Sequence, residues 1–176
     1  MYFNQIILIT KLNQKGEIME PRIIELNEMK AVGMTVRTTV VENKIPNLWD
    51  KFMKRTSEIK NVNDKEICLG ICFHDEMDGC SEDSMFTYMA SKLVDKISDV
   101  PDNMLSRELS AETYAVFTHK GALDNLDKTY NKIYAEWLPQ CNYKTAEADE
   151  FEWYDHRFKF GQEDSEMFIY VPVVKK

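Results

Sequence analysis

The run Asp149-Glu150-Phe151-Glu152-Trp153-Tyr154-Asp155 is the stretch around which the rest of this chain is organised. Acidic and aromatic side chains alternate along it, and a strand sends alternate side chains to opposite faces. The pattern places Phe151 and Trp153 on a core face, and Glu152 and Tyr154 on the other face. A carboxylate beside aromatic rings suits a bulky organic cation, because the ring faces and the negative charge attract the same ligand. The alternative is that Glu152 points into water, since Glu is seldom buried without a partner.

The length, composition and charge of the chain favour a single globular domain and argue against a nucleic-acid-binding or membrane protein. With 176 residues, 44% of them apolar, the chain is long enough to fold as one domain. The formal net charge of −8 argues against direct nucleic-acid binding, which needs a basic patch to neutralise phosphates. The first ten residues have no basic start and only four consecutive aliphatic residues, so they predict neither a signal peptide nor a membrane span.

The cysteines predict free thiols in a reducing, cytoplasmic environment. They form no CxxC pair and no metal-like grouping with the histidines, so we expect no metal and no cofactor. The residues concerned are Cys68, Cys72, Cys80, Cys141, His74, His119 and His156.

The first half of the domain reads as strand, helix, strand, strand. Residues 22–41 are rich in β-branched side chains, which indicates one long or two short strands. Asn43 is the expected N-cap of the next helix, with Pro46 in its first turn. Strands are expected at 66–73 and 85–91, joined by a solvated acidic loop that lacks the spacing of a calcium site. The apolar stripe of the helix comprises Ile45, Leu48, Trp49, Phe52 and Met53.

The second half repeats this order after a linker at 94–103. A strand is predicted at 109–117, a turn at 118–121, and further strands at 151–155 and 167–173. The helix between them carries an apolar stripe of Leu123, Leu126, Tyr130, Ile133, Tyr134 and Trp137. Two halves of matching order predict an α+β fold with pseudo-twofold symmetry and a ligand cleft where the halves meet.

The expected domain covers residues 19–176, with a first module at about 22–98 and a second at about 104–174. Residues 1–18 are expected to be an N-terminal extension, either a loose arm or a peripheral strand. An edge strand there would allow a homodimer. Tyr88, on the 85–91 strand, either lines the cleft or packs within the sheet.

Four motifs carry a family resemblance. Residues 114–121 (YAVFTHKG), 134–139 (YAEWLP), 151–155 (FEWYD) and 165–172 (SEMFIYVP) resemble the GyrI-like small-molecule-binding family. That family includes the effector-binding domains of AraC-type and MerR-type transcription regulators. The resemblance implies two strand-helix-strand-strand (SHS2) modules around a cleft that takes amphipathic, often cationic, aromatic compounds. Regulators in the family also carry a helix-turn-helix segment, and this sequence has none, so we expect a free-standing binder.

The resemblance also implies roles for particular residues. The pocket acid of the family maps onto Glu152, and Trp137 closes the second helix as the family's tryptophan does. The expected ligand-binding residues are Glu152, Tyr88, Tyr154, Trp137, Trp153 and Trp49.

Two alternatives to ligand binding stay open at this point. The first is hydrolysis of cyclopropane-bearing toxins, with Glu152 as general base and Tyr88 or Tyr154 as its partner. No nucleophilic Ser or Cys constellation supports other hydrolytic chemistry, and His119 reads as a turn residue. The second is a protein-protein inhibitor of the gyrase-inhibitor type, for which the acidic charge is the supporting feature.

Overall fold

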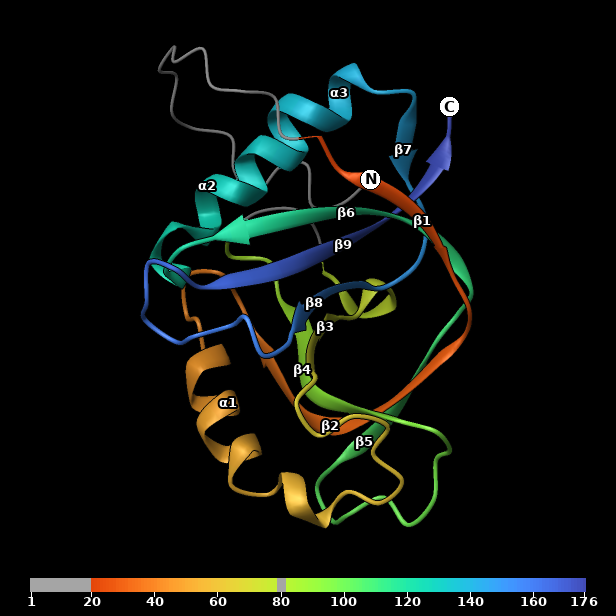
Figure 1. Cartoon of the computed structure of the whole chain (residues 1–176), viewed down its shortest axis with the longest axis vertical. Coiled ribbons are helices and arrows are strands. Elements are labelled where there is room, and N and C mark those ends of the chain that lie inside the picture. The colour runs from red at the N-terminus through yellow and green to blue at the C-terminus, as the bar shows by residue number, and fades with distance from the viewer. Residues whose placement is uncertain (1–19, 79–81) are drawn as a thin grey trace.

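The computed structural model of the protein describes residues 20–78 and 82–176. Its strands are β1 (Arg22–Leu26), β2 (Met29–Thr38), β3 (Cys68–Cys72), β4 (Phe86–Val94), β5 (Leu105–Leu109), β6 (Glu112–Lys120), β7 (Tyr143–Thr145), β8 (Glu150–Tyr154) and β9 (Glu166–Lys175). Its helices are α1 (Ile45–Met53), α2 (Leu126–Asn131), the π-helical η4 (Lys132–Trp137) and α3 (Leu138–Gln140). Short 3₁₀ turns are η1 (Thr56–Glu58), η2 (His74–Glu76) and η3 (Leu123–Asn125). A large antiparallel sheet with few helices confirms the α+β class (Figure 1).

The strands follow the order β1-β6-β9-β8-β3-β4-β2-β5, and β7 pairs with β9. The two halves of the chain meet in the middle of the sheet, where β3 pairs with β8 and Gly70 lies opposite Glu152. On the other side of β3, Tyr88 of β4 lies opposite Cys72. Three neighbouring strands therefore bring Gly70, Tyr88 and Glu152 together, although these residues are far apart in the sequence.

The two faces of the central strands are buried against different partners. On one face Leu69 and Phe151 pack in a core that the curled sheet closes with side chains of its own outer strands. On the opposite face, Phe52 of α1 packs with Tyr88, and Ile133 of η4 packs with Tyr154 and Cys68. A fully buried Phe or Ile contributes about 1.5–3 kcal/mol. Helices from both halves therefore cover the face that carries Glu152.

The start of α1 differs from the prediction. Asn43 does not cap the helix: its φ is +41°, in the left-handed region that Asn tolerates at turns. Lys44 is the N-cap residue and makes no side-chain cap hydrogen bond. Instead, the Thr38 hydroxyl accepts the Lys44 N–H at 3.1 Å, and the Thr39 hydroxyl accepts the N–H of Glu42 at 3.0 Å. The preceding strand end therefore satisfies backbone donors that an N-cap side chain would otherwise take.

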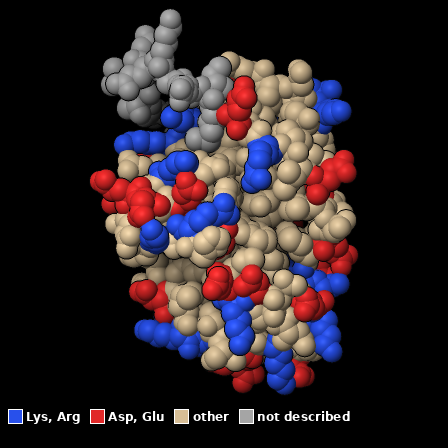
Figure 2. Space-filling model, in the orientation of Figure 1, with Lys and Arg blue, Asp and Glu red and all other residues tan. Residues whose placement is uncertain are grey.

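The surface carries both signs of charge. Figure 2 shows Lys and Arg interspersed with Asp and Glu on the face in view. Some charged side chains form exposed ion pairs, such as Lys60 with Asp99 at 2.8 Å. Exposed pairs of this kind contribute little to stability. No helix in the described ranges is long and apolar enough to cross a membrane. The expected extension at residues 1–18 lies outside the described residues.

Candidate functional site

Strand β8 is the platform of the site. Glu150, Glu152 and Tyr154 point to the helix-covered face, while Phe151 and Trp153 belong to the opposite core. Glu152 is only 7% exposed. The predicted alternation along this strand is confirmed, and the open question of whether Glu152 points into water is answered by its burial.

Three phenol groups hold the Glu152 carboxylate. Tyr88 of β4 donates to Glu152 Oε2 at 2.6 Å, and Tyr154 of β8 donates to the same oxygen at 2.7 Å. Tyr130 of α2 donates to Oε1 at 3.0 Å. Hydrogen bonds to an ionised acceptor are about twice as strong as neutral ones, so this shell stabilises the carboxylate as an anion.

The phenols remain donors over the whole physiological pH range. Burial raises the pKa of Tyr88, Tyr130 and Tyr154 well above the usual value near 10, and the negative charge of Glu152 raises it further. None of these side chains carries a positive charge. The Glu152 anion is therefore solvated by hydrogen bonds and has no compensating cation among them.

Gly70 makes room for this arrangement. A Cβ atom at this position would lie 1.8 Å from the Tyr88 hydroxyl oxygen and 2.8 Å from Glu152 Oε2. Any other residue at Gly70 would therefore displace the Tyr88–Glu152 hydrogen bond. The φ angle of Gly70 is not in the left-handed region, so backbone conformation does not require a glycine here. The close approach of the Tyr88 and Glu152 side chains to its backbone does.

Trp49 of α1 completes one wall of the site. Its indole Nε1–H donates to the Tyr88 hydroxyl at 3.3 Å, and its ring meets the Tyr154 ring edge-on at a centroid distance of 5.3 Å. Trp49 and Tyr130 are half-buried, whereas Tyr88 and Tyr154 are buried. The more accessible walls therefore come from the two helices, α1 and α2.

Glu150 is a second buried carboxylate on the same face. It is 6% exposed, and its Oε2 accepts a hydrogen bond from the Tyr134 hydroxyl of η4. Its Oε1 has no hydrogen-bond partner among the described residues. Burial raises the pKa of Glu150 to about 8, with a further rise from the charge of Glu152, while the Tyr134 hydrogen bond opposes the shift. Burial therefore favours the protonated form of Glu150.

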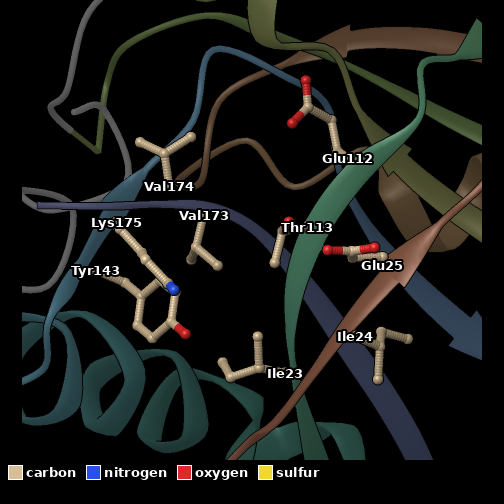
Figure 3. Close-up of a pocket in the computed structure, with 9 residues that line it drawn as sticks. All are labelled: Ile23, Ile24, Glu25, Glu112, Thr113, Tyr143, Val173, Val174 and Lys175. Carbon is tan, nitrogen blue, oxygen red and sulfur yellow. The ribbon is translucent and has the colours of Figure 1, made fainter.

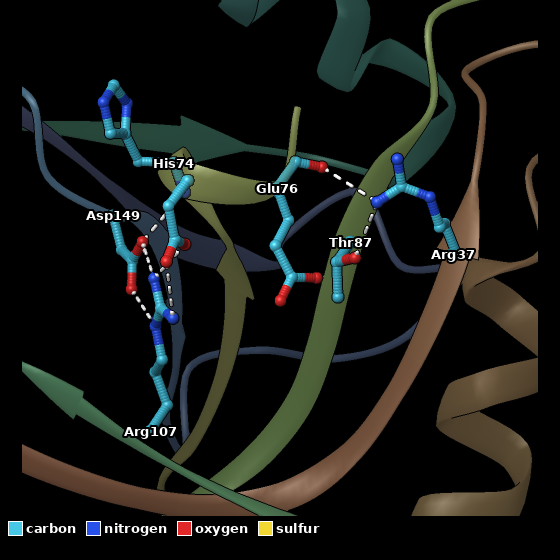
Figure 4. A network of polar contacts seen from close by, with 7 residues as sticks. Arg37, His74, Glu76, Thr87, Arg107 and Asp149 are labelled. Carbon is cyan, nitrogen blue, oxygen red and sulfur yellow. Dashed lines mark hydrogen bonds and ion pairs between the residues drawn. The ribbon is translucent and has the colours of Figure 1, made fainter. Parts of the chain in front are cut away.

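Asp149, the next acidic residue, is fully paired. Arg107 of β5 donates to Asp149 Oδ2 at 2.6 Å and to Oδ1 at 2.8 Å, and the His74 backbone N–H donates to Oδ1 at 2.9 Å. Figure 4 shows Arg107 paired with Asp149. Arg107 also pairs with Asp75 at 2.6 Å, and its guanidinium lies 4.1 Å from the centre of the Phe73 ring. This network fastens η2 to the sheet. In the described ranges, by contrast, no Lys, Arg or His forms an ion pair with Glu150 or Glu152.

The remaining predicted residues lie away from Glu152. Trp153 is on the opposite face of β8, beside Tyr170 at a ring distance of 5.9 Å. Trp137 packs edge-on against Phe117 at 5.1 Å. Both contacts are part of the packed cores. The structure thus brings together four of the six predicted residues, namely Glu152, Tyr88, Tyr154 and Trp49.

Sequence reasoning missed Tyr130, Tyr134 and Glu150. The helical spacing places both tyrosines on an apolar stripe, and their rings do stack at 6.4 Å, but their hydroxyls point to the carboxylates. The π-helical turn that carries Tyr134 is a feature often found at functional sites. The position of Glu150 is predictable from the alternation of side chains along a strand, because it lies two residues before Glu152 and so faces the same side.

His119 has a structural position at the end of β6. Its Nδ1 lies 2.7 Å from the Thr129 hydroxyl, and its Nε2 lies 3.3 Å from the Ala122 carbonyl oxygen. A ring with Nε2 protonated satisfies both contacts. His119 therefore links the strand to the following helix, and it lies within a strand and not in a turn.

A separate pocket of about 630 Å³ lies on the outer strands (Figure 3). None of the six predicted ligand-binding residues lines it. Its lining comes from Ile23, Ile24, Glu25, Glu112, Thr113, Tyr143, Val173, Val174 and Lys175. The pocket carries both signs of charge, and so differs from the surroundings of Glu152.

The fold and the site define an α+β domain whose two halves enclose a phenol-bound carboxylate. The profile of the GyrI-like small molecule binding domain matches residues 19–174, and the chain belongs to this family. The transcriptional regulator BrlR of Pseudomonas aeruginosa is 30% identical over 156 residues, which is 88% of this chain. The chain spans 56% of the length of BrlR.

Solved structures share the fold. SAV2435, in a structure with bound tetraphenylphosphonium, has a TM-score of 0.69 and 20% identity, covering 89% of this chain and 94% of its own. The C-terminal domain of EcmrR has a TM-score of 0.65 and 16% identity, covering 90% of this chain and 99% of its own. These proteins are what this chain is similar to in architecture.

Proposed function

We propose that this chain binds amphipathic aromatic cations at Glu152, with Tyr88, Tyr130, Tyr154 and Trp49 as the aromatic walls. The observation that carries the proposal is a buried carboxylate whose hydrogen-bond donors in the described ranges are all neutral phenols. An ion buried without a counter-ion costs several kcal/mol. A ligand cation would supply the missing charge, and the ring faces would attract it as well.

We place the ligand entrance between α1 and α2, because their side chains Trp49 and Tyr130 are the half-buried members of the shell. The site would then lie between two strand-helix-strand-strand modules, at about 22–98 and 104–174. The strand order supports this division, since β2-β4-β3 on one side of the centre mirrors β6-β9-β8 on the other. An opening between α1 and α2 would expose the carboxylate to a ligand while the pairing of β3 with β8 stays in place.

The family and the structure of SAV2435 with a phosphonium cation support the same ligand class. BrlR is a transcriptional regulator longer than this chain, so a ligand-sensing role is the part of its activity that we transfer. The proposal includes no direct contact with nucleic acid. A homodimer through residues 1–18 stays a prediction, which sedimentation with and without these residues tests.

The test is a thermal-shift titration of the wild type and Glu152→Gln. Tetraphenylphosphonium is the cationic probe, and triphenylphosphine oxide is a neutral probe of similar aromatic character. A ligand at a hundred times its Kd stabilises the folded state by about 2.7 kcal/mol. Glu152→Gln should bind the cation at least tenfold more weakly and the neutral compound about equally. The variant should fold, because a phenol hydroxyl can accept a hydrogen bond from the Gln amide as well as donate one.

Glu25→Gln is the matched control, because Glu25 is an exposed carboxylate of the outer pocket in Figure 3. Equal weakening of both probes by Glu152→Gln would remove the role of the Glu152 charge, and weakening by Glu25→Gln would move the site to the outer pocket. Mass spectrometry of each recovered ligand, and of a cyclopropane-bearing compound incubated with the protein, tests for hydrolysis. Unchanged compounds support a binding protein, and a hydrolysed cyclopropane substrate would favour Glu152 as a general base.

A further inference from the structure

Glu150 has no part in the binding site proposed above, yet its geometry points to a ligand. Glu150 and Glu152 lie on the same face of β8, two residues apart, so their Cα atoms are about 6.6 Å apart at the usual rise of a strand. Oε1 of Glu150 is buried without a hydrogen-bond partner among the described residues. Burying such an oxygen without a hydrogen-bond donor destabilises the folded state, and the penalty is larger when the oxygen belongs to a charged group.

Among residues 20–78 and 82–176, the groups that face Glu150 come from four elements, and none of them is basic. Glu152 lies on the same strand, and Tyr134 of η4 donates to Oε2. Tyr130 of α2 donates to Glu152 Oε1 at 3.0 Å, and its hydroxyl also lowers the pKa of Glu150, though less than the Tyr134 hydrogen bond does. Cys72 lies opposite Glu150 in the register of β3 and β8. Burial and the neighbouring carboxylates raise the pKa of the Cys72 thiol well above its usual value, so it is neutral.

Two buried carboxylates on the same strand face do not both ionise when no cation lies beside them, because their mutual repulsion adds to the cost of burial. The hydrogen bonds decide which one carries the charge. Glu152 accepts from three phenols and Glu150 from one, so Glu152 is the better-stabilised anion. Glu150 then holds a proton, consistent with its pKa of about 8.

We propose that Glu150 is a second anionic group of the same ligand site, neutral when the site is empty and ionised when a dicationic ligand places its second charge beside it. This inference rests on the proposed function at Glu152. The ligand class is an aromatic dication whose charges are about 7 Å apart, the spacing set by two residues of strand. A monocation that pairs with Glu152 leaves the proton on Glu150.

The experiment compares two permanently charged ligands by calorimetry. Benzyltrimethylammonium is the monocation, and para-xylylene-bis(trimethylammonium) is the dication with the required spacing. Neither can lose a proton, so any proton released on binding comes from the protein or its surroundings. Titrations at pH 6.5 in buffers of different ionisation enthalpy count that proton. We expect about one proton released per dication and close to none per monocation.

The pH dependence gives a second readout. The ratio of monocation Kd to dication Kd should rise about tenfold per pH unit below the pKa of Glu150 and level off above it. Glu150→Gln should abolish proton release and the pH-dependent preference while still binding the monocation. Tyr134→Phe removes a hydrogen bond that favours the ionised form, so it should move the levelling-off to higher pH.

The outcomes separate the two proposals. Dication binding without proton release, or an unchanged pH-dependent preference in Glu150→Gln, would overturn the role of Glu150 and leave Glu152 as the binding group. Failure of both compounds and of tetraphenylphosphonium to bind the wild type would overturn the proposed function and this inference with it.

Discussion

Gly70→Ala is the most direct perturbation of the site, because it adds one methyl group and removes no polar atom. The new Cβ would lie 1.8 Å from the Tyr88 hydroxyl oxygen and 2.6 Å from Tyr88 Cζ. Tyr88 is 5% exposed and has little free space around it. The ring must therefore move, and its 2.6 Å hydrogen bond to Glu152 is lost.

The expected change in unfolding free energy combines two destabilising terms and one stabilising term. Overpacking of a filled interior costs about 1–3 kcal/mol. Loss of a hydrogen bond to a charged group costs about 1.5–3 kcal/mol. Replacing Gly by Ala restricts the unfolded chain and returns about 0.4–1 kcal/mol. The net destabilisation is about 1.5–5.6 kcal/mol, a large share of the roughly 5–15 kcal/mol that stabilises an ordinary domain.

A double-mutant cycle measures how much of the Gly70→Ala destabilisation comes from the clash with Tyr88. Urea unfolding gives the free energy of unfolding of the wild type, Gly70→Ala, Tyr88→Ala and the double variant. Tyr88→Ala removes both clashing Tyr88 atoms, so Gly70→Ala should cost less than about 1 kcal/mol in that background. Gly33→Ala is the matched control, because its Cβ would meet the backbone oxygen of Ala90 at 2.0 Å and not a side chain. Its cost should not depend on Tyr88. Equal costs of Gly70→Ala in both backgrounds would refute the reasoning.

Three further predictions concern the surroundings of the site. Arg107→Ala leaves the buried Asp149 without its cation and should cost about 3 kcal/mol in urea unfolding, with part recovered when Asp149→Asn is added. Thr129→Val leaves His119 Nδ1 buried and unpaired and should cost about 1–3 kcal/mol, whereas Thr129→Ser should cost less than half as much. Because the pKa of Glu150 is raised to about 8, the folded state holds a proton that the unfolded state loses near pH 4.5. The unfolding free energy of the wild type relative to Glu150→Gln should therefore fall by up to about 1.4 kcal/mol per pH unit between those values, and a constant difference would contradict the assignment.

The sequence predicted the order of elements better than their pairing. The strands around Cys68–Cys72, Phe86–Val94 and Glu150–Tyr154 follow from β-branched and alternating residues. Strand β5 (Leu105–Leu109) was missed because only Leu109 in it is buried, so it has no clear alternation. The pairing of β3 with β8 joins segments about half the chain apart, and no local pattern encodes such a contact.

The candidate site was also predictable only where a local sequence pattern determines the position of a side chain. Alternation placed Glu152 and Tyr154 on one face, and the same rule placed Trp153 on the other, away from the carboxylate. Tyr130 was hidden, because a tyrosine on an apolar helix stripe reads as core until the position of its hydroxyl is known. Gly70 was hidden too, since its role depends on Tyr88 and Glu152 approaching from two neighbouring strands.

The acidic residues at 149, 150 and 152 show that the alternation of side chains along a strand predicts the face of each carboxylate but not its charge state. Asp149 points to Arg107 and is neutralised by it, whereas Glu150 and Glu152 point to the opposite face, where the donors among the described residues are neutral. The period assigns each carboxylate to a face, but its charge state depends on donors from other elements. Three donors favour the anion at Glu152, and one donor with an orphan oxygen favours the acid at Glu150. The proposed ligand response follows from this difference in donors: a monocation pairs with Glu152, whereas a dication also pairs with Glu150 and displaces its proton.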